Sequence, residues 1–369
     1  MAGLALTSLK LSHFRSHKSG KVIPDGRPLA FFGANGAGKT NILEAVSLLS
    51  PGRGIRRAAI EEFSRTPELI GWKVSATLES LGHNHEVTTW AEPGLSRQVE
   101  IDDKPAPQLA LGRLLRMVWL VPSMDRLWLE GAEGRRRFLD RMTLSFVPDH
   151  AEATLAYEKA MRQRNRLLKD RVSNDSWYRA LEVRMAETGA EITENRMATL
   201  ERIKAAQDDT TSAFPIADLT LIDGGEYPVE PGKDALLASL LNGRPRDMMA
   251  GRTLSGPHRA DLGAVFAAKE IEARLCSTGE QKALLISLIL ANARALSQDF
   301  GAAPIILLDE VAAHLDENRR ALLYDEIIAL GAQAWMTGTD ASLFDALGTR
   351  AALFEVSDGS DGSVIKERA

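Results

Sequence analysis

The sequence has few of the features that mark disulfide-bonded, membrane-spanning or secreted proteins. Its 369 residues include one cysteine, Cys276, which excludes a disulfide framework and a cysteine-rich zinc site and fits a reducing cytosol. The longest apolar stretch, around residues 283–291, is too short to span a bilayer. Residues 1–10 alternate in polarity and are too short for a signal peptide. We therefore expect a cytoplasmic protein with no membrane partner.

The sequence also lacks an excess of positive charge and a wealth of aromatic residues. The formal net charge is −5, which excludes a uniformly basic protein but leaves room for a local basic face. Aromatic residues make up only 6%, and no aromatic-rich platform for single strands is visible. Contact with the backbone of duplex nucleic acid is therefore favoured over base stacking.

The order of secondary-structure signals predicts an α/β protein with an inserted helical lobe. Residues 29–32 form an unbroken apolar run typical of a buried strand, and alternating segments over 72–101 predict an antiparallel meander. Long charged segments with helical spacing follow over residues 134–208. The last third alternates helix and strand, which implies a parallel sheet covered by helices. The predicted parts are residues 1–130 (first half of the head), 131–250 (inserted, mainly helical lobe) and 251–369 (second half of the head).

A glycine-rich segment carries the clearest chemical signal. Residues 33–40 match G-x-x-x-x-G-K-[ST] between a predicted strand and a predicted helix. Such a loop turns its backbone N–H groups toward phosphates, and the helix N-terminus adds a positive dipole. We expect Lys39 to reach the β- and γ-phosphates and Thr40 to bind Mg²⁺; a flexible surface loop is the alternative. The residues expected to hold ATP here are Gly33, Ala34, Asn35, Gly36, Ala37, Gly38, Lys39, Thr40 and Asn41.

A second apolar strand, predicted over residues 304–308, ends in two carboxylates. Asp309 is placed to hold Mg²⁺ beside Thr40. Glu310 could polarise an attacking water as a general base, so Lys39 and Glu310 are the predicted catalytic pair. The alternative is an ordinary strand followed by an acidic helix cap.

A pentapeptide opens the apolar helix predicted to end near residue 296. It reads Ser277, Thr278, Gly279, Glu280 and Gln281. A structural explanation is a helix cap at Ser277 or Thr278, with Gln281 as the capping-box partner of Thr278. The functional explanation is a nucleotide-binding signature similar to that of ABC ATPases. Those proteins carry their signature just before the strand that corresponds to residues 304–308 here, the strand that precedes Asp309. Its hydroxyl and helix N-terminus would grip the γ-phosphate bound by a second subunit.

Two shorter segments fit the same plan. Residues 313–316 resemble the D-loop that crosses the dimer interface of such ATPases, with Asp316 as the candidate nucleotide-site residue. Residues 337–339 resemble the switch segment that senses the γ-phosphate. Either segment could be a simple strand-to-helix turn, since Gly, Thr and Asp are common in turns.

Basic residues gather locally despite the acidic total. Residues 131–172 hold ten Lys/Arg against six Asp/Glu, a net of +4, and Arg164 lies among them. Such clusters can neutralise phosphates without reading sequence, although a solvated helix face with ion pairs is the alternative. The candidate DNA-binding residues are Arg53, Arg56, Arg57, Arg135, Arg136, Arg137, Arg162 and Arg166.

Together these segments resemble the RecF family. Residues 9–15 are similar to its opening strand, residues 131–140 to its arginine-rich segment and residues 253–262 to its Gly-Pro-His motif. The segments 277–282, 307–316 and 336–340 complete the set. The chain departs from the pattern at Ala260, where the family usually has an acidic residue, and at residues 122–125. We therefore assign neither Asp125 nor Asp261 to a metal.

The resemblance implies a fold, a cofactor set and partners. The fold would be an ABC/SMC-like ATPase head with an antiparallel β region and an inserted helical lobe. The protein would bind ATP and Mg²⁺ between two head-to-tail chains and hydrolyse ATP slowly. The ATP-dependent homodimer would load on duplex DNA near single-strand gaps and act with RecR and RecO to load RecA. Arg15 and His17 are the candidates for adenine contacts.

Three alternatives remain on the sequence alone. A transporter nucleotide-binding subunit would be shorter and would lack the long insert and the Gly-Pro-His element. A small-molecule P-loop kinase would need an acceptor pocket and no signature helix. A nucleotide-gated scaffold without hydrolysis is disfavoured by Glu310.

Overall fold

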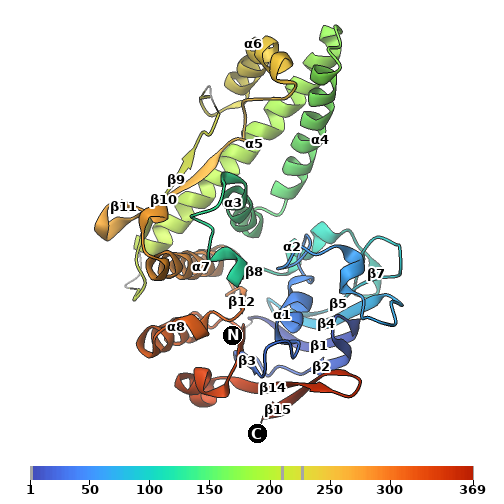
Figure 1. Ribbon diagram of the computed structural model, residues 1–369, viewed down its shortest axis with the longest axis vertical. Helices are drawn as coiled ribbons and strands as arrows, with labels where there is room; N and C mark the ends of the chain where they lie inside the picture. Colours follow the sequence, from blue (N-terminus) through green and yellow to red (C-terminus); the bar gives the residue numbers. More distant parts are fainter. Residues whose placement is uncertain (1–2, 209–211, 226–227, 369) are drawn as a thin grey trace. The chain divides into compact units, whose positions relative to one another are not determined.

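The computed structural model describes residues 3–208, 212–225 and 228–368, and the chain divides into two compact units (Figure 1). Unit 1 comprises Met1–Asp125, Thr210–Phe214 and Leu285–Ala369. Unit 2 comprises Arg126–Asp209 and Pro215–Leu284. Within the described ranges, no helix is long and apolar enough to cross a membrane.

A mainly parallel sheet forms one half of unit 1. Its strand order is β15-β14-β3-β13-β12-β8, and only β15 runs antiparallel to its neighbour. The strands are β3 (Leu29–Phe32), β8 (Met117–Leu120), β12 (Ile305–Leu308), β13 (Ala334–Gly338), β14 (Ala352–Gly359) and β15 (Gly362–Arg368). Every residue of β3 and β12 is buried, which explains their unbroken apolar sequences.

Three helices belong with this sheet. They are α1 (Lys39–Ser47), α8 (Glu317–Leu330) and the part of α7 (Thr278–Phe300) from Leu285 onward. Side chains of α7 and α8, among them Ile289 and Ile327, meet Leu308 of β12 in one apolar cluster. Helix α1 is the next element after β3 and is joined to it by residues 33–38, so its first turn lies near the carboxyl end of that strand.

An antiparallel sheet forms the other half of unit 1, with strand order β2-β1-β4-β5-β6-β7. The strands are β1 (Leu4–Phe14), β2 (His17–Val22), β4 (Trp72–Ser80), β5 (His83–Ala91), β6 (Gln98–Ile101) and β7 (Lys104–Pro105). Burial alternates along β4, so one face of this sheet packs on the core that it shares with α1 and the parallel sheet. A short helix, α2 (Leu111–Leu114), leads toward β8.

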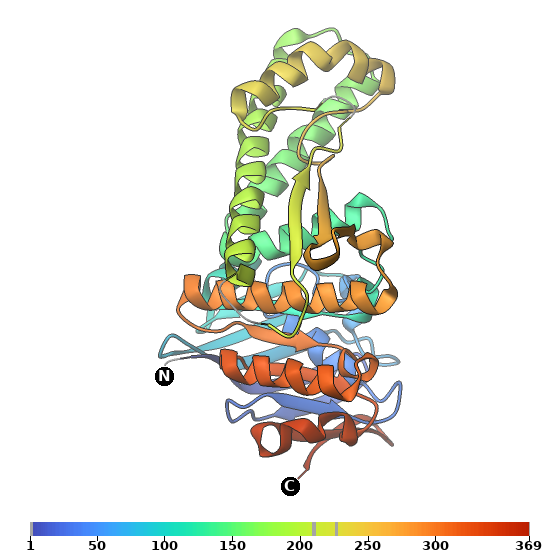
Figure 2. The same ribbon diagram turned by 90° about the vertical axis from the view of Figure 1, so that its left-hand side faces the viewer.

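Unit 2 is built from long helices and a small sheet. Its helices are α3 (Ala132–Phe146), α4 (His150–Lys169), α5 (Asp175–Asp208), α6 (Lys233–Ala250) and the start of α7, and its strands are β9 (Ala217–Ile222), β10 (Asp261–Phe266) and β11 (Ile271–Glu272). Figure 2 shows β9 running beside α5, and β10 pairs with β9. Tyr157, Met185 and Leu240 lie in the small apolar core that joins α4, α5 and α6.

Short 3₁₀ helices fill the connections. In unit 1 they are Ile60–Phe63, Gln108–Ala110, Pro122–Met124, Ala312–His314 and Ala341–Arg350, and in unit 2 they are Ala267–Lys269 and Ala273–Leu275.

The two units divide the chain differently from the predicted parts. Residues 251–284, which we expected in the second half of the head, group with the helical unit. The reason is strand pairing, because β10 pairs antiparallel with β9 along its whole length. Helix α6 and the β14–β15 hairpin were not predicted at all.

Candidate nucleotide-binding site

The glycine-rich segment is the connection between β3 and α1, as the sequence pattern requires. Gly33 has a positive φ of 149°, and a Cβ there would lie 2.0 Å from the carbonyl oxygen of Val356. Gly38 has a φ of 102° and caps α1, and a Cβ there would lie 2.5 Å from Ser363 Oγ and 2.6 Å from Ser16 Oγ. Only glycine fits both positions without displacing the strands below the loop.

The side chain of Lys39, the first residue of α1, reaches back into this loop. The residue is 4% exposed, and its Nζ donates hydrogen bonds to the carbonyl oxygens of Gly33 and Ala34, both at 2.8 Å. Burial lowers the pKa of Lys39, and the nearby carboxylates of Glu310 and Asp309 oppose that shift. The ammonium group is thus held at the loop by two neutral carbonyl oxygens. The charged oxygens of a phosphate would be stronger acceptors and could take their place.

Asp309 joins three of the predicted segments. Its Oδ1 accepts hydrogen bonds from Thr40 Oγ1 and from Thr337 Oγ1, both at 2.8 Å. The hydroxyl of Thr337 also accepts the backbone N–H of Glu310 at 2.9 Å. These residues meet because β3, β12 and β13 are parallel neighbours, so that their carboxyl ends lie at one edge of the sheet.

The oxygen atoms at this edge fit Mg²⁺. The ion prefers hard oxygen ligands and commonly takes only one or two from protein, with the rest from water and phosphate. The Thr40 hydroxyl and the Asp309 carboxylate supply such a pair.

The segment 277–281 lies in unit 2, and Ser277, one of the two predicted cap residues, caps α7 with a different partner from the predicted one. Ser277 donates to Glu280 Oε2 from both its backbone N–H and its hydroxyl, at 2.8 Å each. Gln281 is buried and donates from Nε2 to the carbonyl of Cys276 at 3.0 Å. The capping box therefore pairs Ser277 with Glu280 rather than Thr278 with Gln281, because the helix begins one residue after Ser277.

Glu280 is the anionic group of this helix terminus. It forms an ion pair with Lys269, and this contact, together with those from Ser277, lowers the pKa of Glu280 to about 2. Thr278 and Gly279 are exposed in the first turn of α7.

Asp316 has a clear structural role. Its Oδ1 accepts the backbone N–H of Arg319 at 2.9 Å and so caps α8. The neighbouring His314 has a side chain that lies outside the described residues. The D-loop role of Asp316 stays a prediction.

Comparison with known proteins identifies the family. Residues 5–359 match the family model described as the RecF/RecN/SMC N terminal domain. The chain is 45% identical over 366 residues to the DNA replication and repair protein RecF of Rhizobium etli, covering 96% of this chain and 98% of that one. The chain belongs to the RecF family. A RecF of Agrobacterium fabrum is 43% identical over 367 residues, covering 96% and 98% of the two chains.

Solved structures confirm the predicted fold class. The recombination mediator protein RecF-ATP in the RecFOR pathway superposes with a TM-score of 0.85 at 24% identity, covering 100% of this chain and 98% of that one. The Smc head domain of Pyrococcus furiosus gives a TM-score of 0.56 at 17% identity, covering 99% and 96%. RecF family membership removes the transporter and kinase alternatives.

Several arginines of the RecF-like segments stabilise unit 2 from within. Arg135 binds the carboxylate of Asp261 through two nitrogens, at 2.8 and 2.7 Å, and Arg136 donates to the carbonyl of Ala260 at 2.8 Å. The arginine-rich segment and the Gly-Pro-His segment of the family are therefore partners of each other in this structure.

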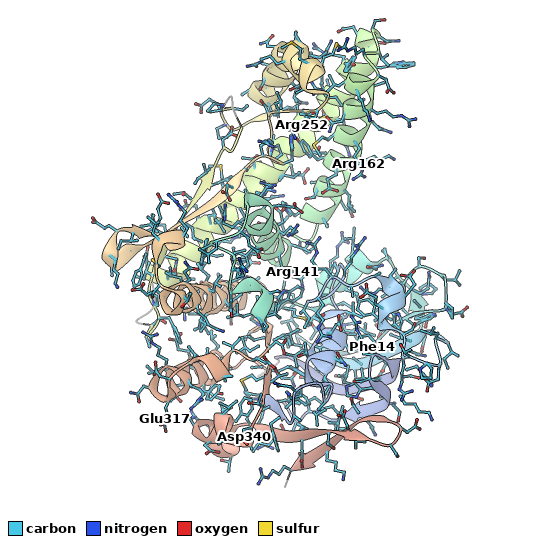
Figure 3. The ribbon with its side chains drawn as sticks, viewed as in Figure 1. Phe14, Arg141, Arg162, Arg252, Glu317 and Asp340 are labelled. Atoms are coloured by element: carbon cyan, nitrogen blue, oxygen red, sulfur yellow. The ribbon has the colours of Figure 1, made fainter. Side chains whose placement is uncertain are left out.

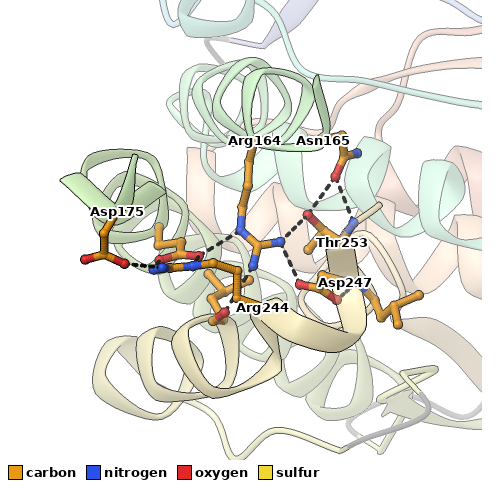
Figure 4. A network of polar contacts seen from close by, with 9 residues as sticks. Arg164, Asn165, Asp175, Arg244, Asp247 and Thr253 are labelled. Carbon is orange, nitrogen blue, oxygen red and sulfur yellow. Dashed lines mark hydrogen bonds and ion pairs between the residues drawn. The ribbon is translucent and has the colours of Figure 1, made fainter. Parts of the chain in front are cut away.

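Arg164 is the most buried of these cations, and Figure 4 shows its polar contacts. Its side chain is fully buried and donates to Glu182 Oε1 at 3.1 Å, Asp247 Oδ2 at 2.6 Å, Thr253 Oγ1 at 2.8 Å and the carbonyl of Leu240 at 3.0 Å. Although its helix carries a run of positive charge in the sequence, Arg164 is part of the interior.

The remaining candidate DNA-binding arginines are exposed. Arg162 and Arg137 form ion pairs with Glu158 and Glu133, respectively, one helical turn away, and Figure 3 shows Arg162 in unit 2. Arg56 donates to Asn41 Oδ1 at 2.8 Å and to Glu44 at 3.2 Å, beside the phosphate loop. The other exposed members of the set are Arg53, Arg57 and Arg166.

The two residues proposed for adenine contacts have other partners. His17 is fully buried, and its Nε2 lies 3.1 Å from the carbonyl of Gly38, beneath the loop. Burial lowers the pKa of His17, against the opposing effect of that carbonyl. Arg15 binds the buried carboxylate of Glu44 at 2.8 and 2.9 Å. His17 is therefore unavailable to a base, and it forms part of the loop's support instead.

Proposed function

We propose that this RecF family member binds ATP and Mg²⁺ at the phosphate loop and uses nucleotide-driven pairing of two chains to clamp duplex DNA near single-strand gaps. One observation carries the proposal. The Asp309 carboxylate lies between the hydroxyls of Thr40 and Thr337, at the sheet edge where Lys39 is held inside a glycine-rich loop.

The residues of this edge divide the work of nucleotide binding and hydrolysis. The loop N–H groups and the N-terminus of α1 favour phosphate, and Lys39 exchanges two neutral carbonyls for charged oxygens. Thr40 and Asp309 hold Mg²⁺, which supplies positive charge to the phosphates when bound. Glu310 acts as the general base toward water, and its N–H is fixed by the hydroxyl that also contacts Asp309.

A complete site would need a second chain. In ATPases with this fold, the signature helix of one subunit closes the nucleotide site of the other, and Ser277 and the exposed first turn of α7 are the groups that would do so here. Binding of ATP between two chains would favour the dimer by mass action, and hydrolysis would release it. This makes the protein a slow clamp whose function depends on the lifetime of the dimer.

The proposed DNA contact is electrostatic. Exposed arginines neutralise phosphates without reading sequence, so binding should weaken as salt is raised. Arg135 and Arg136 have contacts inside unit 2, so the proposed DNA-binding set is the exposed residues Arg53, Arg56, Arg57, Arg137, Arg162 and Arg166. RecR with RecO, and through them RecA, are the proposed protein partners, because the solved relatives belong to the RecFOR pathway.

The test is molecular mass in solution with and without ATP–Mg²⁺ and gapped duplex DNA. We expect a wild-type dimer with ATP, and in Lys39→Met a monomer with ATP affinity at least about tenfold weaker, since a charge-assisted contact is lost. Glu310→Gln should bind ATP, stay dimeric and not hydrolyse it. Lys73→Met removes an exposed lysine of unit 1 and should behave as wild type. A wild-type monomer indifferent to ATP and DNA would refute the clamp.

A further inference from the structure

The hairpin formed by β14 and β15 contacts both ends of the phosphate loop. At the start of the loop, the carbonyl of Val356 in β14 occupies the space beside Gly33. At the end of the loop, the hydroxyl of Ser363 in β15 occupies the space beside Gly38. The loop is therefore bracketed by a segment more than 300 residues away in the sequence.

The contact at the end of the loop is a chain of hydrogen bonds. Ser363 Oγ donates to Ser16 Oγ at 2.7 Å, and Asn41 Nδ2 donates to the same oxygen at 2.8 Å. The backbone N–H of Ser363 also donates to the carbonyl of Ser16 at 2.9 Å. Ser363 is 4% exposed, so water competes poorly for these groups. Asn41 follows Thr40 directly in the first turn of α1. This chain of hydrogen bonds therefore ends at a residue of the proposed nucleotide site.

The hairpin turn is itself fixed to the same part of the protein. Asp361 forms ion pairs with Lys18 and Arg65. Gly362 has a φ of 106°, and a Cβ there would lie 2.4 Å from the carbonyl of Ser16. The glycine therefore allows the turn to approach Ser16 closely enough for the next residue, Ser363, to reach its hydroxyl.

We propose that Ser363 is a positioning residue for nucleotide binding, which acts through Ser16 on Asn41 and the end of the phosphate loop. The proposal rests on ATP binding at this loop, as proposed above. Ser363 does not touch the nucleotide; it holds the loop in its binding geometry before ATP arrives. Without the Ser363 hydroxyl, part of the binding energy is spent on ordering the Asn41 side chain and the first turn of α1.

The inference is tested by equilibrium binding of a fluorescent ATP analogue and by ATPase kinetics on the full chain. Ser363→Ala should raise the Kd for ATP about three- to tenfold, as expected for the loss of one hydrogen bond, and should raise KM while kcat stays within about twofold. Ser16→Ala removes the shared acceptor and should do the same. The double variant should bind ATP no more weakly than either single variant, because all three variants interrupt the same chain of hydrogen bonds.

Ser357→Ala is the matched control, since Ser357 is an exposed serine of the same hairpin. It should bind ATP as the wild type does, and thermal unfolding should show that all variants remain folded. If the wild type binds ATP and Ser363→Ala binds it with an unchanged Kd, this inference is overturned while the proposed function stands. Fully additive losses in the double variant, or a fall in kcat with an unchanged KM, would also overturn it. Absence of ATP binding by the wild type would refute the proposed function together with it.

Discussion

The buried cation of unit 2 gives a prediction with a worked magnitude. Replacing Arg164 by Met removes the ion pairs to Asp247 and Glu182 while keeping most of the side-chain volume. Glu182 retains two contacts from Arg244, whereas Asp247 retains the backbone N–H of Leu254 at 3.0 Å and the charge of Arg246. Breaking a buried pair so that one charge is left uncompensated costs roughly 3–5 kcal/mol, and the surviving partner of Glu182 places this case near 3 kcal/mol.

The loss should also depend on pH. Burial already raises the pKa of Asp247 above its ordinary value, against the effect of Arg164, and removal of the arginine raises it further. A carboxyl whose pKa is higher in the folded than in the unfolded protein adds to the free energy of unfolding at low pH. This contribution is lost as pH rises through the pKa of the folded state. The deficit of Arg164→Met should therefore be larger at pH 8 than at pH 5.5.

Hydrogen exchange of α4 and α6 as a function of urea measures this stability within unit 2. Arg162→Met is the matched control, because Arg162 lies on the same helix, is 65% exposed and forms an exposed ion pair with Glu158. It should cost no more than about 0.5 kcal/mol. A deficit below about 1 kcal/mol for Arg164→Met, or a larger deficit at pH 5.5, would contradict the reasoning.

Two further predictions concern single side chains. Thr337→Val removes the hydroxyl between Asp309 and Glu310 and should lower kcat for ATP hydrolysis about tenfold or more in single-turnover assays; a change below twofold would count against the proposed site. Burial lowers the pKa of His258 to about 4, below its unfolded value near 6.5, so stability should be lost as pH falls from 6.5 to 4, by about 3 kcal/mol at most. Urea unfolding at pH 7 and 4.5 should show a smaller difference in His258→Gln than in wild type; equal differences would exclude this role.

The parts of the site that follow from local sequence were predictable. A glycine loop between a buried strand and a helix needs only residues 29–47, and the strand before Asp309 is marked by its own apolar run. The contact between Asp309 and Thr40 could also be predicted from the sequence, because parallel strands place their carboxyl ends at the same edge of a sheet.

The parts that depend on distant partners were not predictable. Ser16 and Ser363 are 347 positions apart, and neither lies in a motif. Arg164 sits in a basic run that reads as a solvated helix face, yet its partner Asp247 lies 83 residues away on α6. That helix was itself missed, since Pro245 lies inside it and proline disfavours a helix interior.

Strand order also sets the sequence of events as the chain is made. The antiparallel sheet β2-β1-β4-β5-β6-β7 uses only residues 4–105 and can pair early. Strand β3 lies between β13 and β14, so it waits for about 300 further residues, or roughly 15–60 s at ribosomal speeds of about 5–20 residues per second. During that time its apolar residues have no strand partner and are a natural target for chaperones. The phosphate loop after β3 likewise gains its contacts with Val356 and Ser363 only when the last two strands have been made.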